Sequence, residues 1–160
     1  MTHDPSAAAE RETTTRTSCP PRVIVVAVDG SPTSWDAFAW AAGAALRAKS
    51  RLVAVHVEPL VEAAATFGAA VDYAAIEMTR RQITRGLQSQ VERAAKELGV
   101  QVTFLVEPGD VTRTVTSIAK ELNADLVVVG RSAKPLHQIA GSLSHRLTCR
   151  HDAPVVVVVP

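Results

Sequence analysis

Short, almost entirely apolar runs are the feature that most constrains the fold. VIVVAV follows Arg22, LVAVHV occupies 52–57, LVVVG occupies 126–130, and VVVVV stands at 155–159. Strands that are apolar on both faces are typical of a parallel sheet covered by helices on both sides. Because 47% of the residues are hydrophobic and only 4% are aromatic, the core must consist mainly of Val, Ala and Leu.

Segments with helical spacing separate these runs, and a further strand is expected at 100–106. Apolar residues recur at helical intervals after Ser34, from about Ala74 to Leu98, after Asp110, and around 136–147. Strict alternation of strand and helix predicts a single α/β domain with a five-stranded parallel sheet, helices on both faces and right-handed crossovers. We expect the strand order 3-2-1-4-5, which the alternation alone does not prove.

Several helix boundaries can also be predicted. We expect Thr33 or Ser34 to cap the first helix, Asp110 to cap the third, and Gly99 to end the second. The apolar face of the second helix is expected to include Ile76, Ile83, Leu87, Val91, Ala94 and Leu98.

The first 21 residues differ from the rest of the chain. They have no apolar periodicity and end in Pro20-Pro21, which predicts a disordered tail before a domain at 22–160. Phosphorylation of its threonines is an alternative role. The tail has no apolar run of the kind found in signal peptides, and VVVVV is too short to cross a bilayer.

Charge and cysteine content indicate the environment. A formal net charge of +1 gives no general attraction to nucleic acids or acidic membranes. Cys19 and Cys149 form neither a CxxC pair nor a disulfide framework. We therefore expect a cytoplasmic protein with neither a nucleic-acid nor a membrane partner.

Candidate binding residues follow the first and fourth strands. In such sheets ligands bind beyond the carboxyl ends of the strands where the winding direction reverses, and there Asp29 and Gly130 would face each other. Gly141-Ser142 has the composition of a helix start, whose unpaired N–H groups and dipole attract anions. These features predict a phosphate-bearing ligand. The alternatives are a capping role for Asp29, a turn role for Gly130, and an ordinary N-cap pair at 141–142.

Other polar residues are weaker candidates. We expect His56 to be a hydrogen-bonded imidazole within its strand. His145, Cys149 and His151 lack an evident fourth ligand, so no zinc site is predicted. Arg131 and Lys134 are more typical of solvated loop charges than of phosphate ligands.

From Arg22 to Pro160 the chain resembles a universal stress protein domain. The resemblance is carried by VIVVAVDGSPTS, by LVAVHV, and by DLVVVGRS followed by GSLSHRLTCRHDAPVVVV. It implies a Rossmann-like fold of the adenine nucleotide alpha-hydrolase type. ATP-binding members carry Gly, two residues, Gly, nine residues, then Gly-Ser or Gly-Thr. Gly130 and Gly141-Ser142 match, but Ala133 replaces the second glycine and the connector after it has seven residues.

The resemblance also implies roles for individual residues. Asp29, with the backbone of Ala27 and Val28, would lie at the adenosine end; Val57 would flank the base; Val129 and Gly130 would flank the ribose; and Ala133, Gly141, Ser142 and Leu143 would approach the phosphates. The implied ligand is ATP, with or without Mg²⁺. A Cβ at Ala133 and the shorter connector would alter the approach of backbone N–H groups to the phosphates.

Three classes of protein remain open. The first is a regulatory protein of the stress response that binds ATP, AMP or cyclic AMP. The second is an interaction module of the same fold without a nucleotide. The third is an adenylyl-transferring or ATP-pyrophosphatase enzyme, but the turn at 29–32 (DGSP) lacks the His-x-Gly-His or Ser-Gly-Gly-x-Asp-Ser motif of such enzymes. We expect no enzyme, with slow ATP hydrolysis left open. We also expect a homodimer through Val155–Val159, an apolar edge strand that a second copy would cover.

Overall fold

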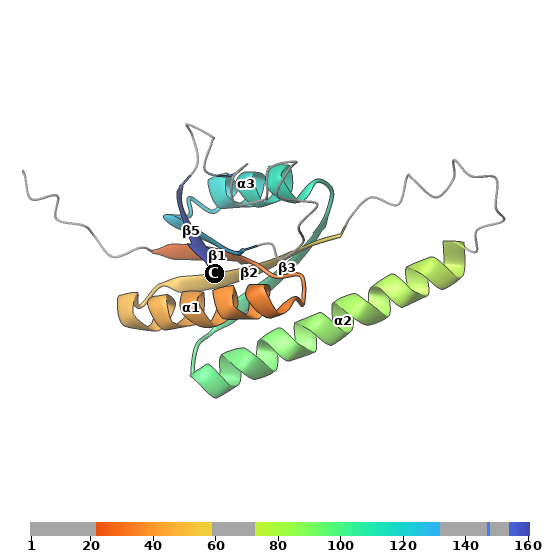
Figure 1. The fold of residues 1–160 in the computed structure, drawn as a ribbon, viewed down its shortest axis with the longest axis horizontal. Helices are drawn as coiled ribbons and strands as arrows, with labels where there is room; N and C mark the ends of the chain where they lie inside the picture. Colours follow the sequence, from red (N-terminus) through yellow and green to blue (C-terminus); the bar gives the residue numbers. More distant parts are fainter. Residues whose placement is uncertain (1–21, 59–72, 132–146, 148–153) are drawn as a thin grey trace, which may run out of the picture.

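The computed structural model describes residues 22–58, 73–131, 147 and 154–160, which form three layers around one sheet (Figure 1). The elements are β1 (Val23–Ala27), α1 (Pro32–Ala48), β2 (Arg51–Glu58), α2 (Tyr73–Leu98), β3 (Val102–Pro108), α3 (Val111–Glu121), β4 (Leu126–Gly130) and β5 (Val155–Val159). The predicted tail at 1–21 and, apart from Leu147, the predicted phosphate loop and fourth helix lie outside the described residues.

The five strands are all parallel and stand in the order β3-β2-β1-β4-β5, which confirms the predicted fold class and strand order. The central strand is β1, where Val25 pairs with Val53 of β2 and with Val127 of β4. The chain winds outward in both directions from this strand. The carboxyl ends of β1 and β4 therefore form the switch point at which ligands bind in sheets of this kind.

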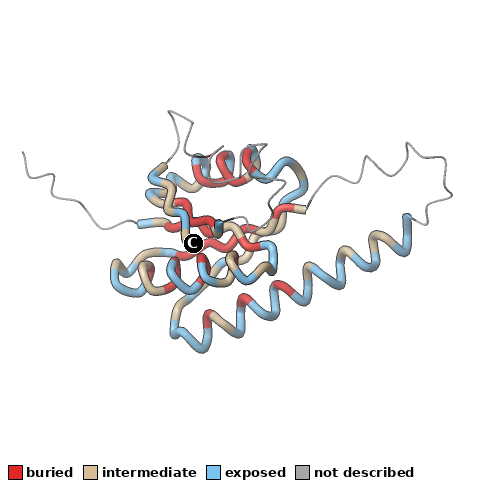
Figure 2. Tube along the Cα trace, viewed as in Figure 1, coloured by how far each residue is buried: buried red, intermediate tan, exposed pale blue. Residues whose placement is uncertain are grey.

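Alternate residues of the strands pack into two separate cores, and Figure 2 shows buried residues in the central strands and in the helices on either side of them. The core under α1 and α2 contains Ile24, Val26, Val28, Phe38, Leu52, Ala54, Leu87, Val91 and Val128. The core under α3 contains Val25, Val53, Val55, Val57, Val115, Ile118, Val127, Val129 and Leu147. Because both faces of the sheet are covered, the strands need apolar residues at successive positions, as the sequence runs indicated.

Helix α1 begins two or three residues earlier than the sequence suggested. The N-cap is Ser31, whose Oγ accepts a hydrogen bond from the Ser34 N–H at 3.3 Å, with Pro32 in the first helical turn. The expectation of Thr33 or Ser34 as N-cap is wrong. Proline has no N–H to lose and a fixed φ that suits the first turn of a helix, so the cap falls on the residue before it.

The other helix boundaries agree with the sequence. Asp110 caps α3 by accepting a hydrogen bond from the Arg113 N–H at 3.0 Å. Gly99, with φ at 70°, follows the last residue of α2. Strand β3 starts at Val102 rather than at Val100, because the Val100 N–H bonds to the Ala95 carbonyl at 2.9 Å and so belongs to the end of α2.

The apolar face of α2 is only partly buried. Leu87 and Val91 pack into the core as predicted, whereas Ile83 is 61% exposed. The N-terminal part of α2 runs out past the sheet, as Figure 1 shows. Leu98, in the last turn, is also exposed. The predicted face is therefore correct in its middle and wrong at these two positions.

Candidate functional site

The turn that leads from β1 into α1 is held by its own polar groups. Asp29 Oδ1 accepts a hydrogen bond from the Ser31 N–H at 2.9 Å, and Gly30 adopts a positive φ of 84°. The buried Ser34 hydroxyl donates to the Ser31 carbonyl at 2.8 Å and accepts from the Asp29 N–H at 3.4 Å. The carboxylate thus helps to shape the entry to α1, although the cap itself is Ser31.

The same hydrogen bonds control the charge of Asp29. Burial raises the pKa of this carboxyl group, but hydrogen bonds from Ser31 and Ser34 more than offset that effect and hold the pKa below the ordinary value of 3.8. Hydrogen bonds to the charged form stabilise it. Asp29 is therefore ionised near neutral pH and can accept hydrogen bonds from hydroxyl groups.

Gly130, at the end of β4, lies directly against the first turn of α1. A Cβ on this residue would stand 2.5 Å from the carbonyl carbon of Thr33 and 2.9 Å from the nitrogen of Ser34. Its φ is not positive, so the glycine is needed for a close approach of two backbones and not for a turn. Contact of Gly130 with a ribose stays a prediction.

His56 is hydrogen-bonded, as the sequence indicated. Its Nδ1 lies 2.9 Å from the carbonyl oxygen of Val28. A carbonyl only accepts, so Nδ1 carries the hydrogen and donates it. The Val28 N–H donates in turn to the Val55 carbonyl at 2.8 Å. Both backbone groups of Val28, a predicted ligand contact, are therefore already bonded within the protein.

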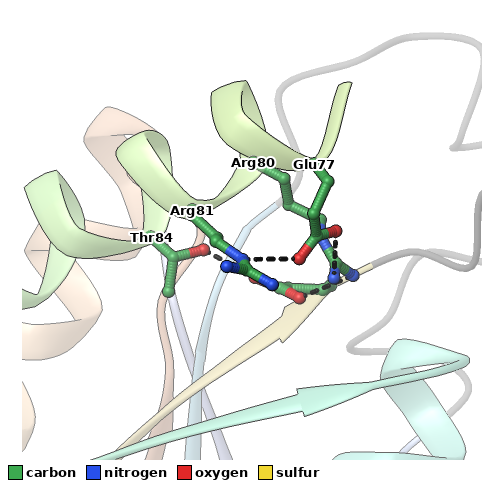
Figure 3. Close-up of polar contacts among 5 residues, drawn as sticks. Glu77, Arg80, Arg81 and Thr84 are labelled. Atoms are coloured by element: carbon green, nitrogen blue, oxygen red, sulfur yellow. Dashed lines mark hydrogen bonds and ion pairs between the residues drawn. The ribbon is translucent and has the colours of Figure 1, made fainter. Parts of the chain in front are cut away.

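A cluster of charged side chains links the carboxyl end of β2 to α2 (Figure 3). The Glu58 carboxylate forms an ion pair with Arg80 at 2.8 Å and accepts a hydrogen bond from the Thr84 hydroxyl at 2.6 Å, and its side chain is only 12% exposed. Arg80 also pairs with Glu77 at 2.6 Å, and Glu77 with Arg81 at 2.8 Å. The contacts of Arg80 and Thr84 with Glu58 hold the projecting part of α2 against the sheet.

On the opposite face of the sheet the same edge is apolar. Ala27, Val57 and Val129 all pack into the core beneath α3. Val26 pairs with Val128, so Ala27, the last residue of β1, and Val129, the residue before the end of β4, lie on neighbouring strands. The structure thus brings these three predicted site residues to one face and places Val28 on the other. The predicted phosphate contacts Ala133, Gly141, Ser142 and Leu143 lie outside the described residues.

One polar residue on this face was not predicted from the sequence. Thr112, in the first turn of α3, is only 4% exposed, and its Oγ1 has no hydrogen-bond partner in the part of the chain that the structure describes. Thr116, one turn later, donates to the Thr112 carbonyl at 2.6 Å and is satisfied. The sequence did contain a clue, because Thr112 lies three residues before Val115 and seven before Ala119. This spacing places it on the same buried face of α3.

A hollow lies at the other edge of the sheet. This cavity of about 810 Å³ is placed between the C-terminal ends of α1 and α2, at the amino ends of β2 and β3. Lys49, Arg51, Lys96 and Glu92 lie around an apolar floor that includes Leu52. None of the predicted site residues contributes to it, and ligands of parallel sheets bind at the carboxyl edge. We therefore place the candidate site at the carboxyl edge despite the size of this hollow.

The described residues also bear on membrane insertion and metal binding. Among the described helices, none is both long and apolar enough to span a membrane. Within the same residues, no group of three His, Cys, Asp or Glu side chains is arranged to hold a metal ion. His145, Cys149 and His151 lie outside the described part of the chain.

The parallel strands and their order define a doubly wound α/β protein. Comparison with known proteins gives the family. The model of the universal stress protein family matches residues 21–159, and the chain belongs to that family. A search of curated proteins finds no match.

Solved structures of the family share the fold. A universal stress protein in complex with cAMP is 21% identical and superposes with a TM-score of 0.67, covering 88% of this chain and 98% of its own. A family member from Burkholderia pseudomallei is 27% identical, with a TM-score of 0.66 and coverages of 86% and 95%. The universal stress protein from Archaeoglobus fulgidus in complex with dAMP is 20% identical, with a TM-score of 0.61 and coverages of 87% and 98%.

Proposed function

We propose that this chain is a regulatory protein of the stress response that binds an adenine nucleotide at the carboxyl edge of its sheet, with ATP as the expected ligand. Two relatives of the same fold were solved with cAMP and with dAMP. The observation that carries the proposal is the meeting of apolar Ala27, Val57 and Val129 on one face of the switch point, with the ionised Asp29 two residues after Ala27.

The chemistry of these groups suits a nucleoside. Val57 and Ala27 offer apolar surface to the flat face of a base, while the Asp29 carboxylate can accept hydrogen bonds from ribose hydroxyls. The phosphates would reach Ala133 and the N–H groups and hydroxyl at Gly141-Ser142. Asp29 Oδ1 already accepts a hydrogen bond from the Ser31 N–H, which leaves one carboxylate oxygen for a metal ion. A Mg²⁺ ion would therefore be bound mainly by the phosphates and would keep most of its water ligands.

Two alternatives follow from the two differences from the ATP-binding loop pattern, namely Ala133 in place of the second glycine and the shorter connector after it. A pocket that holds fewer phosphates would prefer AMP or cyclic AMP, and a pocket that holds none would leave an interaction module. Titrations with AMP, cyclic AMP and ATP separate these possibilities. Tightest binding of ATP would remove the smaller-ligand alternative.

We further propose that the protein acts in the cytoplasm by binding and not by catalytic turnover. At this turn the Asp29 carboxylate accepts a hydrogen bond from the Ser31 N–H, and the hydroxyls of Ser31 and Thr33 are paired with each other. No paired carboxylates or Ser-His-Asp arrangement stand out in the sequence. An assay of ATP hydrolysis would contradict this proposal if it showed multiple turnovers that Asp29→Asn abolished.

We also propose a homodimer through β5. This strand lies at the edge of the sheet, and Val155 is 64% exposed. An apolar strand edge invites pairing with another chain. Val155→Lys should yield a folded monomer by light scattering, whereas Val157 packs on the core and is less suitable for substitution. An unchanged dimer would exclude this interface.

Calorimetric titration with Mg-ATP tests the nucleotide proposal. We expect micromolar binding to the wild type, and Gly141→Val should abolish it by placing a side chain at the expected phosphate site. Gly86→Ala is the control, because its Cβ would meet no atom within 4 Å. Absence of heat with the wild type, together with no nucleotide released on denaturation, would favour the interaction module.

A further inference from the structure

Thr112 is the exception among the polar side chains near the carboxyl edge of the sheet. The hydroxyls of Ser34 and Thr84 are hydrogen-bonded, as is the imidazole of His56. Thr112 is more deeply enclosed than most of them, yet among the described residues its Oγ1 is bonded to nothing. A buried hydroxyl without a partner destabilises the folded state, so its presence calls for a physical explanation.

The position of Thr112 points to a ligand as that explanation. Helix α3 starts just after β3 ends at Pro108, so its first turn lies at the carboxyl edge. Thr112 belongs to the stripe of α3 that is buried with Val115 and Ala119. Because α3 packs against β2, this stripe covers the face on which Val57 lies.

The chemistry of the position favours a nucleobase over a phosphate. Thr112 carries no charge, and the side chains it is buried with on this face are mainly apolar. Phosphates are bound by several N–H donors or by cations, whereas a base presents one apolar face and a polar edge. A threonine hydroxyl can both donate and accept, which suits an edge that carries ring nitrogens and an exocyclic group.

We propose that Thr112 Oγ1 is a hydrogen-bond partner for the polar edge of the base, so that α3, as well as the strand ends, forms the base-binding wall of the site. This assignment rests on the proposed nucleotide-binding function. It predicts that the hydroxyl is retained at the expense of stability in the nucleotide-free protein and is satisfied only when a base is bound.

The test is Thr112→Val, which keeps the shape of the side chain and removes the hydroxyl. We expect about a tenfold loss of affinity for ATP and a similar loss for AMP, since the lost contact is to the base; a tenfold change corresponds to about 1.4 kcal/mol. Thr112→Ser should retain most of the affinity. Inorganic triphosphate, which has no base, should bind wild type and Thr112→Val equally.

A second readout needs no ligand. Without nucleotide, Thr112→Val should raise the melting temperature, because it removes an unpaired buried hydroxyl. Thr116→Val is the matched control: it removes a hydroxyl that is bonded to the Thr112 carbonyl, and it should leave ATP affinity within twofold of wild type.

The outcomes separate this inference from the function on which it rests. If the wild type binds neither ATP nor AMP, the proposed function fails and the assignment of Thr112 falls with it. If the wild type binds ATP and Thr112→Val binds it equally well, the assignment alone is overturned. A lower melting temperature for Thr112→Val without nucleotide would also overturn it, because the hydroxyl would then serve the protein itself.

Discussion

The two sides of the carboxyl edge differ in how their polar groups are used. On the α1 and α2 side, Asp29 bonds to Ser31, His56 bonds to Val28, and Glu58 bonds to Arg80 and Thr84. On the α3 side, the described residues contribute apolar surface and the unpaired hydroxyl of Thr112.

This difference indicates where a ligand can bind. A nucleotide on the α1 side would have to break existing hydrogen bonds or separate backbones in contact, and each unpaired buried group costs about 1–3 kcal/mol. On the α3 side it would supply a partner to Thr112. We therefore expect the nucleotide to bind on the α3 side, with Asp29 as the group that reaches it from the switch point.

The largest effect should come from filling the contact between β4 and α1. Gly130→Ala places a Cβ against the backbone of Thr33 and is expected to cost about 3 kcal/mol of unfolding free energy, at the upper end for overpacking because backbone cannot move aside as a side chain can. Urea denaturation measures it. Gly86→Ala should instead stabilise by up to about 1 kcal/mol, because alanine is the better helix former. Equal stability of Gly130→Ala and wild type would show that the α1 side is not closed.

A smaller effect is expected from the ion cluster. Arg80→Met leaves the poorly exposed Glu58 without its cation and should cost about 2 kcal/mol. Arg81→Met removes an exposed partner of Glu77 and should cost less than about 0.5 kcal/mol. Urea denaturation of both variants compares them. If the two substitutions cost the same, the cluster does not hold α2 to the sheet.

The smallest effect concerns the charge of Asp29. Its lowered pKa means that the ionised form contributes stability above pH 3.8, and that this contribution is lost as the pH falls through the folded-state pKa. The stability gap between wild type and Asp29→Asn should therefore be constant near neutral pH and shrink in acid. Thermal unfolding at a series of pH values measures this gap. A gap that persisted after Asp29 was protonated would mean that its charge is not what holds the turn.

The sequence predicted most of the fold, because the information is local. Apolar runs and helical spacing identified all the described elements, and Asp110 and Gly99 were recognisable as helix boundaries. The cap at Ser31 was missed because Thr33 and Ser34 are equally good capping residues, and only Pro32 in the first turn decides among them. Ile83 was assigned to the core because periodicity does not report where a helix outruns its sheet.

The site was harder to predict than the fold. The resemblance named the backbone of Ala27 and Val28 and the position of Val57, and the pleat of a strand sends the side chains of neighbouring residues to opposite faces. Ala27 and Val28 therefore lie on different sides of the sheet. The close approach of Gly130 to Thr33 depends on how α1 packs on β4, which no local pattern contains. Thr112 became noticeable only when burial and hydrogen bonding were both known.

The central claim, that the nucleotide binds on the α3 side of the carboxyl edge, is tested most directly by methyl NMR during titration with Mg-ATP. We expect the methyl signals of Ala27, Val57 and Val129 to shift, while those of Leu87 and Val26 on the α1 side, and of Leu46 at the opposite edge, stay in place. Shifts confined to Leu87 and Val26 would place the ligand on the α1 side, and shifts at Leu46 would place it in the hollow between the helix ends. Either result would contradict the claim.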